Sequence, residues 1–273
     1  MRKVWSILVV CMLALVVSAC GKTEVSDEKE AVSSEQEKQV IRVATDSESV
    51  PFTFLNTETG ELDGLLLDIA NELGNRLDVE IELQNMEWTA LIPSVQSKKV
   101  DAVVAAMYIT EERKKVLNFT DPIFGYGEGL IVQEGDNKTK SLEDLKGKTV
   151  GVQMGTSYKD MLDEKAPNLD LTVKAYKTAA DMISDLENKR IDAMLSDKPV
   201  FEYLKQADPE MKINIIDEYE PALFGDIGIG VNKENEELLS RLNEKIDEIK
   251  EDGTLKEIYN KWQLDYDYEK NKE

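Results

Sequence analysis

Short apolar runs alternate with amphipathic segments along most of this chain. Runs of about four to eight apolar residues predict strands, and longer segments with apolar residues three and four positions apart predict helices. In the first part of the chain this pattern predicts strands at 40–45, 79–83 and 100–106 and helices at 65–77 and 89–97. The resulting order, β-α-β-α-β, is typical of an α/β fold.

The same alternation begins again after the Gly-Tyr-Gly sequence at 125–127. It predicts strands at 129–133, 149–153, 171–175 and 191–195 and helices at 141–145, 158–164 and 178–188. A further strand at 227–231 precedes two amphipathic helices at 234–251 and 255–262. Two α/β units of about 90 to 100 residues fit the usual domain size better than one large body.

Residues 100–124 form the segment that most clearly indicates a binding site. The predicted strand is followed by a polar turn at 108–110, a helix that opens at Glu111, and a stop at Asp121-Pro122. Arg113 therefore lies in the first turn of the predicted helix, directly after the turn that follows the strand, beside the backbone N–H groups of the helix start. Such an arginine can bind a carboxylate, and this is the main site hypothesis.

The N-terminus has the features of a secretory signal. Arg2 and Lys3 precede an apolar run at 4–17, and small residues stand directly before Cys20. This resembles a bacterial lipobox, so we expect residues 1–19 to be a signal peptide and Cys20 to carry lipid. An uncleaved anchor is the alternative, although the run is shorter than the ~20 residues that a span needs. Residues 20–39 are polar and are expected to be a flexible tether.

The composition excludes several classes of chemistry. The chain has no histidine, and its two cysteines, Cys11 and Cys20, both lie in or beside the signal. Catalysis by Ser-His-Asp or Cys-His and an ordinary zinc site are therefore excluded, and no cofactor or metal is expected. The formal net charge of −22 argues against nucleic acid as a partner.

Six segments in a fixed order resemble the polar amino-acid-binding proteins of bacterial ABC importers, the family 3 extracellular solute-binding proteins. They are TDSESVPFTF (45–54), GELDGLLLDIANELG (60–74), the stretch from 88 to 124, LKGKTVGVQMGTS (145–157), RIDAMLSD (190–197) and the stretch from 224 to 262. The resemblance covers essentially all of residues 40–265.

This resemblance implies an α/β, two-lobed periplasmic-binding-protein fold of type II. Each lobe would be a mostly parallel sheet flanked by helices, with a hinge of two strands. Lobe 1 would comprise residues 40–125 and 225–265, lobe 2 residues 126–224, and residues 266–273 a tail. The hinge would fall at 125–129 and 221–226, where glycines are compatible with a bend.

The resemblance also implies a binding protein rather than an enzyme. We expect a monomer that captures a polar, and by preference basic, amino acid between its lobes and delivers it to an ABC permease. The lipid on Cys20 would hold it at the outer face of the cell membrane. The alternatives are a dehydratase-like enzyme that uses Glu48 or Asp197 as acid or base, and a ligand-sensing co-receptor.

Three residues are expected to bind the ligand carboxylate. Arg113 matches the family's carboxylate-binding arginine, with a surface ion pair to Glu111 or Glu112 as the alternative. Thr156 and Ser157 would add hydroxyl and N–H donors, although either could serve only as a helix N-cap.

Asp197 follows the predicted strand at 191–195, where the family places the partner of the ligand ammonium. The alternative is a solvated turn aspartate. Ala106 and Tyr108 occupy positions that help to bind the ammonium and carboxylate in the family, and Tyr108 is bulkier than the usual residue there.

The ligand side chain is expected to meet the loop after the first strand and a tryptophan. Asp46, Glu48 and Ser49 lie in that loop, and Ser49 replaces an aromatic residue common in the family. Glu48 could instead be an ordinary exposed acid. Trp88 would form the second wall, with Phe52 nearby, and the alternative for Trp88 is a core ring. These acids favour a basic or polar ligand.

Overall fold

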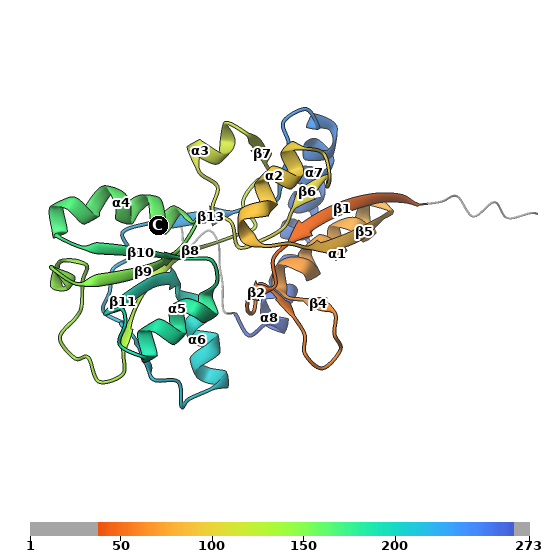
Figure 1. Ribbon diagram of the computed structural model, residues 1–273. Coiled ribbons are helices and arrows are strands. Elements are labelled where there is room, and N and C mark those ends of the chain that lie inside the picture. Colours follow the sequence, from red (N-terminus) through yellow and green to blue (C-terminus); the bar gives the residue numbers. More distant parts are fainter. Residues whose placement is uncertain (1–37, 265–273) are drawn as a thin grey trace, which may run out of the picture. The chain divides into compact units, whose positions relative to one another are not determined.

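The computed structural model describes residues 38–264, which form two sheets with their helices (Figure 1). The predicted signal, Cys20, most of the tether and the tail lie outside the described residues. We call the first sheet with its helices lobe 1 and the second sheet with its helices lobe 2. Within residues 38–264, no helix combines the length and apolar character needed to cross a bilayer.

Lobe 1 is built on a five-stranded sheet in the order β5-β1-β6-β14-β7. Its strands are β1 (Gln39–Thr45), β5 (Val79–Asn85), β6 (Ala102–Val103), β7 (Leu117–Phe119) and β14 (Gly230–Asn232). Its helices are α1 (Leu65–Leu77), α2 (Leu91–Gln96), α3 (Glu111–Lys114), α7 (Glu236–Glu251) and α8 (Thr254–Lys261), with a 3₁₀ turn at Trp88–Ala90.

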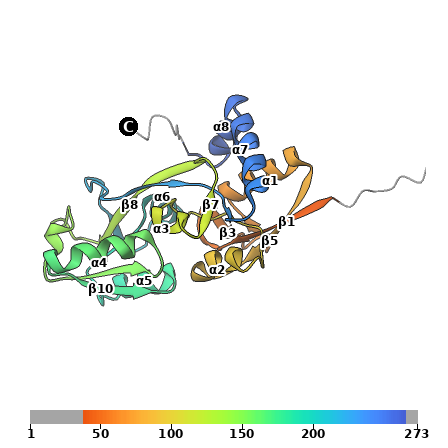
Figure 2. The ribbon, with the colours of Figure 1, turned by 90° about the horizontal axis from the view of Figure 1, so that it is seen from above.

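Helix α1 shows how the sequence pattern produces this packing. Its leucines and Ile69 recur at helical spacing, and Leu66, Ile69 and Leu73 are fully or almost fully buried. The helix ends where Asp78 adopts a left-handed conformation and its N–H bonds back to Asn75 and Gly74. Figures 1 and 2 show α1 lying beside β5.

A small three-stranded sheet follows β1 in lobe 1. It consists of β2 (Glu48–Ser49), β3 (Thr53–Leu55) and β4 (Leu62–Asp63) in antiparallel pairing. The sequence pattern did not predict it, because two- and three-residue strands are too short to show alternation. Phe52 precedes β3 and turns into the core, where its ring stacks on Tyr126 at a centroid distance of 5.4 Å.

Lobe 2 is built on a sheet in the order β10-β9-β11-β8-β12, to which β13 adds along β8. Its strands are β8 (Phe124–Gln133), β9 (Thr149–Gln153), β10 (Thr172–Tyr176), β11 (Ala193–Asp197), β12 (Ile213–Ile215) and β13 (Phe224–Ile227). Its helices are α4 (Ser157–Leu169), α5 (Ala179–Glu187) and α6 (Lys198–Ala207), with a 3₁₀ turn at Glu143–Leu145.

Both main sheets are mixed rather than mostly parallel, which corrects that part of the prediction. In lobe 1, β1 pairs in parallel with β5 and β6, whereas β14 is antiparallel to β6 and β7. In lobe 2, β9 is parallel to β10 and β11, and β8 is antiparallel to β11 and β12. The strand of opposite direction is β14 in lobe 1, which joins its sheet after the chain returns from lobe 2. In lobe 2 it is β8, the first strand of that lobe.

The two segments expected at the hinge pair with each other. Strand β13 runs antiparallel to the first half of β8, with Phe224 opposite Gly127 and Asp226 opposite Gly125. The fully buried carboxylate of Glu128 ties the segment before β13 to β8, since it accepts hydrogen bonds from the Tyr219 hydroxyl and from the N–H groups of Ala222 and Leu223 at 2.7 to 2.9 Å. The predicted single strand at 227–231 is in fact two strands, because the chain leaves β8 after Ile227 and joins the lobe 1 sheet at Gly230.

Gly225 makes room for the ring of Tyr108 at this crossing. A Cβ atom on Gly225 would lie 2.1 Å from two ring atoms of Tyr108. That ring is buried, and its hydroxyl donates a hydrogen bond to the Tyr126 carbonyl at 2.7 Å, so it cannot easily move aside. We therefore expect Gly225→Ala to lower the free energy of unfolding by about 1 to 3 kcal/mol, as measured by urea denaturation.

The control for this prediction is the same change in a chain that carries Tyr108→Ala. Without the ring, the three nearest contacts of the added methyl group are relieved, so Gly225→Ala should cost clearly less in that background. An equal cost in both backgrounds would show that the contact with Tyr108 is not the cause.

Candidate functional site

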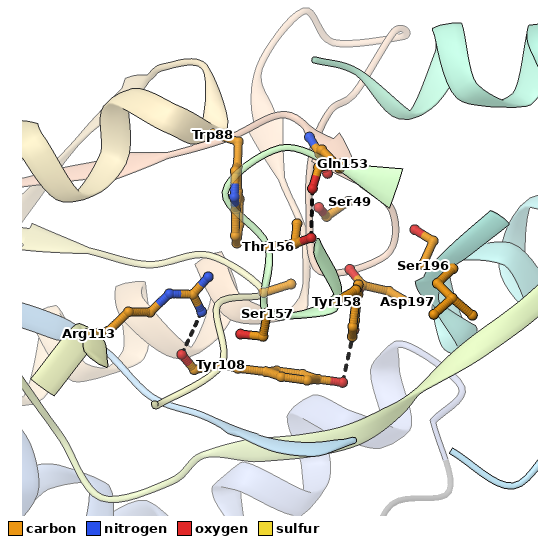
Figure 3. Close-up of a pocket in the computed structure, with 12 residues that line it drawn as sticks. Ser49, Trp88, Tyr108, Arg113, Gln153, Thr156, Ser157, Tyr158, Ser196 and Asp197 are labelled. Atoms are coloured by element: carbon orange, nitrogen blue, oxygen red, sulfur yellow. Dashed lines mark hydrogen bonds between the residues drawn. The ribbon is translucent and has the colours of Figure 1, made fainter. Parts of the chain in front are cut away.

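A narrow cavity lies where the two lobes meet, and most of the predicted site residues line it (Figure 3). Lobe 1 contributes Ser49, Trp88, Ala106, Tyr108 and Arg113. Lobe 2 contributes the ends of β9 and β11 and the start of α4, namely Gln153, Thr156, Ser157, Tyr158, Leu195, Ser196 and Asp197. The free space in it is about 30 Å³, enough to hold water.

Arg113 is 9% exposed, and its guanidinium points into this cavity from the start of α3. The hydroxyl of Thr110 caps the helix by accepting a hydrogen bond from the Arg113 N–H. One terminal nitrogen of Arg113 donates to the Tyr108 carbonyl at 2.7 Å and the other to the Gly155 carbonyl at 3.1 Å. Burial lowers the pKa of the guanidinium from its ordinary value.

The alternative of a surface ion pair for Arg113 is wrong. Glu111 pairs with Lys114 and Glu112 pairs with Lys115. Among residues 38–264, no carboxylate forms an ion pair with Arg113. A buried guanidinium that holds only neutral carbonyl groups retains its attraction for an anion.

The Gly-Thr-Ser turn after β9 faces Arg113 from lobe 2. Thr156 is the N-cap of α4: its hydroxyl donates to the Gln153 carbonyl at 2.7 Å and accepts from the Lys159 N–H at 3.3 Å. Its side chain is thus occupied by the capping role that was the alternative. Ser157 lines the cavity, and its hydroxyl forms no hydrogen bond with other described residues.

Asp197 ends β11 and reaches the cavity at the N-terminus of α6. The Tyr158 hydroxyl donates a hydrogen bond of 2.5 Å to one carboxylate oxygen. Burial raises the pKa of Asp197 to about 6, and the hydrogen bonds from Tyr158 and Tyr126 oppose this shift. The charge of Asp46 also raises the pKa, whereas that of Arg113 lowers it. The alternative of a solvated turn aspartate is wrong.

Three tyrosines connect Asp197 to the crossing strands. The hydroxyls of Tyr158 and Tyr108 lie 2.9 Å apart, and their rings meet edge to face. The Tyr158 hydroxyl donates to Asp197, and the single proton of the Tyr108 hydroxyl can go to either the Tyr158 oxygen or the Tyr126 carbonyl on β8. The ring of Tyr108 packs against Gly225, and its backbone carbonyl holds Arg113.

A second, wider cavity of about 510 Å³ continues from the first and shares Trp88 and Gln153 with it. Four acids line it, Asp46, Glu48, Glu87 and Asp181, and Lys177 is the one basic residue among its described lining residues. The acids come from both lobes, so this space also lies where the lobes face each other.

Asp46 and Glu48 hold structural positions at the edge of the wider cavity. The buried Asp46 carboxylate accepts from the hydroxyls of Ser49 and Thr53 and from the Glu48 N–H, at 3.0 to 3.2 Å. Burial raises the pKa of both carboxyl groups, most of all through the loss of water around them. Glu48 also accepts a hydrogen bond from the Ala179 N–H at the start of α5 in lobe 2.

Trp88 is half-buried and is not simply a core ring. Its Nε1 donates to the Gly155 carbonyl at 3.2 Å, and the Arg113 guanidinium lies 5.7 Å from its ring centroid. Phe52, by contrast, is fully buried among aromatic rings and lines neither cavity, because its side chain points into the core.

The sequence reasoning missed Gln153, Tyr158, Leu195 and Ser196. Tyr158 directly follows the Gly-Thr-Ser turn, and Gln153 ends the strand before that turn. Their positions beside the predicted Thr156 and Ser157 could have indicated that they belong to the site. No group of histidine, cysteine or acidic residues within residues 38–264 could hold a metal ion.

The sequence model of a protein family, the bacterial extracellular solute-binding proteins of family 3, matches residues 41–265. The chain belongs to this family. It is 34% identical over 226 residues to the putative ABC transporter arginine-binding protein 2 of Escherichia coli, covering 82% of this chain and 90% of that protein. The histidine-binding periplasmic protein of the same organism is 33% identical over 240 residues, with 84% and 89% covered.

The fold of this family 3 protein agrees with a solved relative. The structure of an ancestral arginine-binding protein bound to arginine superposes with a TM-score of 0.77 at 37% identity, and covers 83% of this chain and 99% of that chain. The two-lobed periplasmic-binding-protein fold is therefore confirmed. These relatives are substrate-binding proteins, not enzymes.

Proposed function

We propose that this protein captures an amino acid with a cationic or polar side chain between its two lobes and delivers it to an ABC permease. The proposal rests on the observation that Arg113 of lobe 1 and Asp197 of lobe 2 line the same cavity. An α-amino acid carries a carboxylate and an ammonium group, and both lose water when the lobes enclose them. Residues of opposite charge on facing lobes offset that loss.

The head group of the ligand would lie in the narrow cavity. Arg113 would bind its carboxylate through two parallel bonds, and the Ser157 hydroxyl and nearby N–H groups of the α4 start would add to them. Asp197 would pair with the ammonium. We expect the lobes to separate to admit the head group, and a ligand that contacts both lobes stabilises the closed form.

The side chain of the ligand would pass Trp88 into the wider cavity. The wider cavity is lined by four acids and one lysine, which favours a cationic end group. A cation over the face of Trp88 would gain about 0.5 to 2 kcal/mol of cation–π attraction. The binding of arginine by the solved relative and of histidine by the Escherichia coli protein supports this preference.

Location and transport form the remaining part of the proposal. The signal at residues 1–19 would export the chain, and lipid on Cys20 would hold the protein at the outer face of the membrane, as a monomer, beside its permease. Membership of a family of extracellular proteins supports this location.

Calorimetry with a panel of amino acids tests the proposal. We expect arginine, lysine or histidine to bind most tightly and glutamine or cystine less so. Glutamate and aspartate should bind at least about tenfold more weakly, because the wider cavity is acidic. A preference for glutamate would contradict the cationic ligand, and no binding by any member would contradict the amino-acid ligand. Turnover of prephenate or arogenate would instead favour the enzyme alternative.

A further inference from the structure

Two donors from lobe 1 converge on one carbonyl group of lobe 2. Trp88 Nε1 lies 3.2 Å and an Arg113 terminal nitrogen 3.1 Å from the Gly155 oxygen. Trp88 stands in the 3₁₀ turn after β5, and Gly155 stands between β9 and α4. The carbonyl therefore joins the two lobes next to Thr156, which lines the narrow cavity.

The backbone of lobe 2 is shaped to present this carbonyl. Gly155 has a φ of +74°, a left-handed conformation that glycine adopts without strain. A Cβ atom there would lie 3.5 Å from Trp88 Nε1, an ordinary contact, so the backbone angle rather than space favours glycine. Thr156 then fixes the turn by capping α4.

The two donors differ in what a ligand does to them. A ligand carboxylate would bind the same Arg113 guanidinium that donates to the Gly155 carbonyl, so the bond from Arg113 can be exchanged for one to the ligand. The indole of Trp88 has a single N–H, and a ligand that lies against the face of the ring leaves that edge on the Gly155 carbonyl. The bond from Trp88 can thus persist when the bond from Arg113 is exchanged.

We propose that Trp88 is a positioning residue that clasps the Gly155 turn and slows the separation of the lobes, so that it prolongs the residence of the bound ligand. The clasp acts without ligand as well as with it. Its effect on residence rests on the proposed function, whereas its effect on lobe separation in the free protein does not.

The test replaces Trp88 by phenylalanine, which keeps an aromatic wall and removes the N–H donor. The matched control is Trp262→Phe, because Trp262 Nε1 donates to Asp68 at 2.7 Å wholly within lobe 1. Both variants are made in the full chain, and thermal unfolding is used to verify that they are folded.

The first measurement is the fraction of ligand-free molecules with separated lobes, obtained from electron spin resonance distances between one label on each lobe. One neutral hydrogen bond corresponds to about a two- to tenfold change in an equilibrium. We expect the ratio of separated to closed molecules to rise about two- to tenfold in Trp88→Phe and to keep its original value in Trp262→Phe. An unchanged ratio in Trp88→Phe would overturn the proposal, whether or not any amino acid binds.

The second measurement is stopped-flow kinetics with arginine. We expect the dissociation rate to rise about two- to tenfold in Trp88→Phe and the association rate to rise with it, because the lobes must separate for both steps. A residue that only forms a wall would raise the dissociation rate of cationic ligands and leave the association rate unchanged. An unaltered dissociation rate would overturn the clasp while leaving the proposed function intact, and a wild-type protein that binds no amino acid would overturn the proposed function alone.

Discussion

Replacing Arg113 by alanine is expected to weaken amino-acid binding by about tenfold to a hundredfold or more. A charge-assisted hydrogen bond contributes roughly 1.5 to 3 kcal/mol, and this guanidinium is buried, pairs with no carboxylate of the described residues and faces the cavity. Without Arg113, the carboxylate of a bound ligand would be enclosed with no positively charged partner. Calorimetry with the preferred ligand from the panel measures the loss.

Two further variants give this prediction its controls. Arg113→Lys keeps the charge but not the two-pronged geometry, so its affinity should fall between those of the wild type and the alanine variant. Arg190→Ala removes an exposed arginine that pairs with Asp185 in lobe 2, and it should bind like the wild type. Affinity within about threefold of wild type for Arg113→Ala, in a protein that unfolds normally, would contradict the assigned role.

The periodicity of the sequence was enough to predict most of the longer elements. Helix α1 and strand β9 have the predicted bounds, because a buried face repeats every third or fourth residue in the helix and the three central residues of the strand are apolar or small and buried. The pattern failed for α6, β7 and β12, and for the small sheet of β2, β3 and β4. The strands among them have two or three residues, too few to show a pattern. Helix α6 is ten residues long and amphipathic, with a proline in its first turn, so its sequence did contain a signal that was overlooked.

The residues of the candidate site were predictable where a charged side chain follows a predicted buried strand. Arg113 and Asp197 are charged residues beside buried strands, and the structure brings both to one cavity. Phe52 could not be placed, because its stacking on Tyr126 depends on how the small sheet packs on the crossing strands. Tyr158 was missed for the reverse reason: its ring looks like ordinary core, and only the fold brings its hydroxyl to Asp197.

The site also shows how one departure from the family pattern is accommodated. Tyr108 is larger than the usual residue at its position, and the structure turns its ring onto Gly225 and its hydroxyl to Tyr126. Its carbonyl remains available to orient Arg113. The side chain therefore contributes to the packing of the crossing strands, and the backbone contributes to the site.

Asp197 should make ligand binding depend on pH in mildly acidic solution. Only the ionised carboxylate can pair with the ligand ammonium, and the pKa of Asp197 in the free protein is about 6. At pH 5 about one molecule in ten carries the ionised group, so affinity should fall about tenfold between pH 7.5 and 5. Asp197→Asn should bind at least about tenfold more weakly at pH 7.5 and lose most of this dependence. Calorimetry at both pH values measures the two effects.

The same residue should affect stability in the opposite direction. Because burial raises the pKa of Asp197 above that of the unfolded chain, the folded state disfavours the ionised form, and this cost develops as the pH rises from about 4 to 6. Asp197→Asn removes the charge and keeps an acceptor for the Tyr158 hydroxyl. Its unfolding free energy in urea should therefore exceed that of the wild type by about 1 to 3 kcal/mol at pH 8, with the difference shrinking toward pH 4. Because the charges of Asp46 and Asp197 interact, the comparison measures Asp197 together with that interaction. A variant that loses affinity and also loses stability at pH 8 would show that the carboxylate supports the fold, whereas weaker binding in a more stable protein is the result expected of a charge held in place for its ligand.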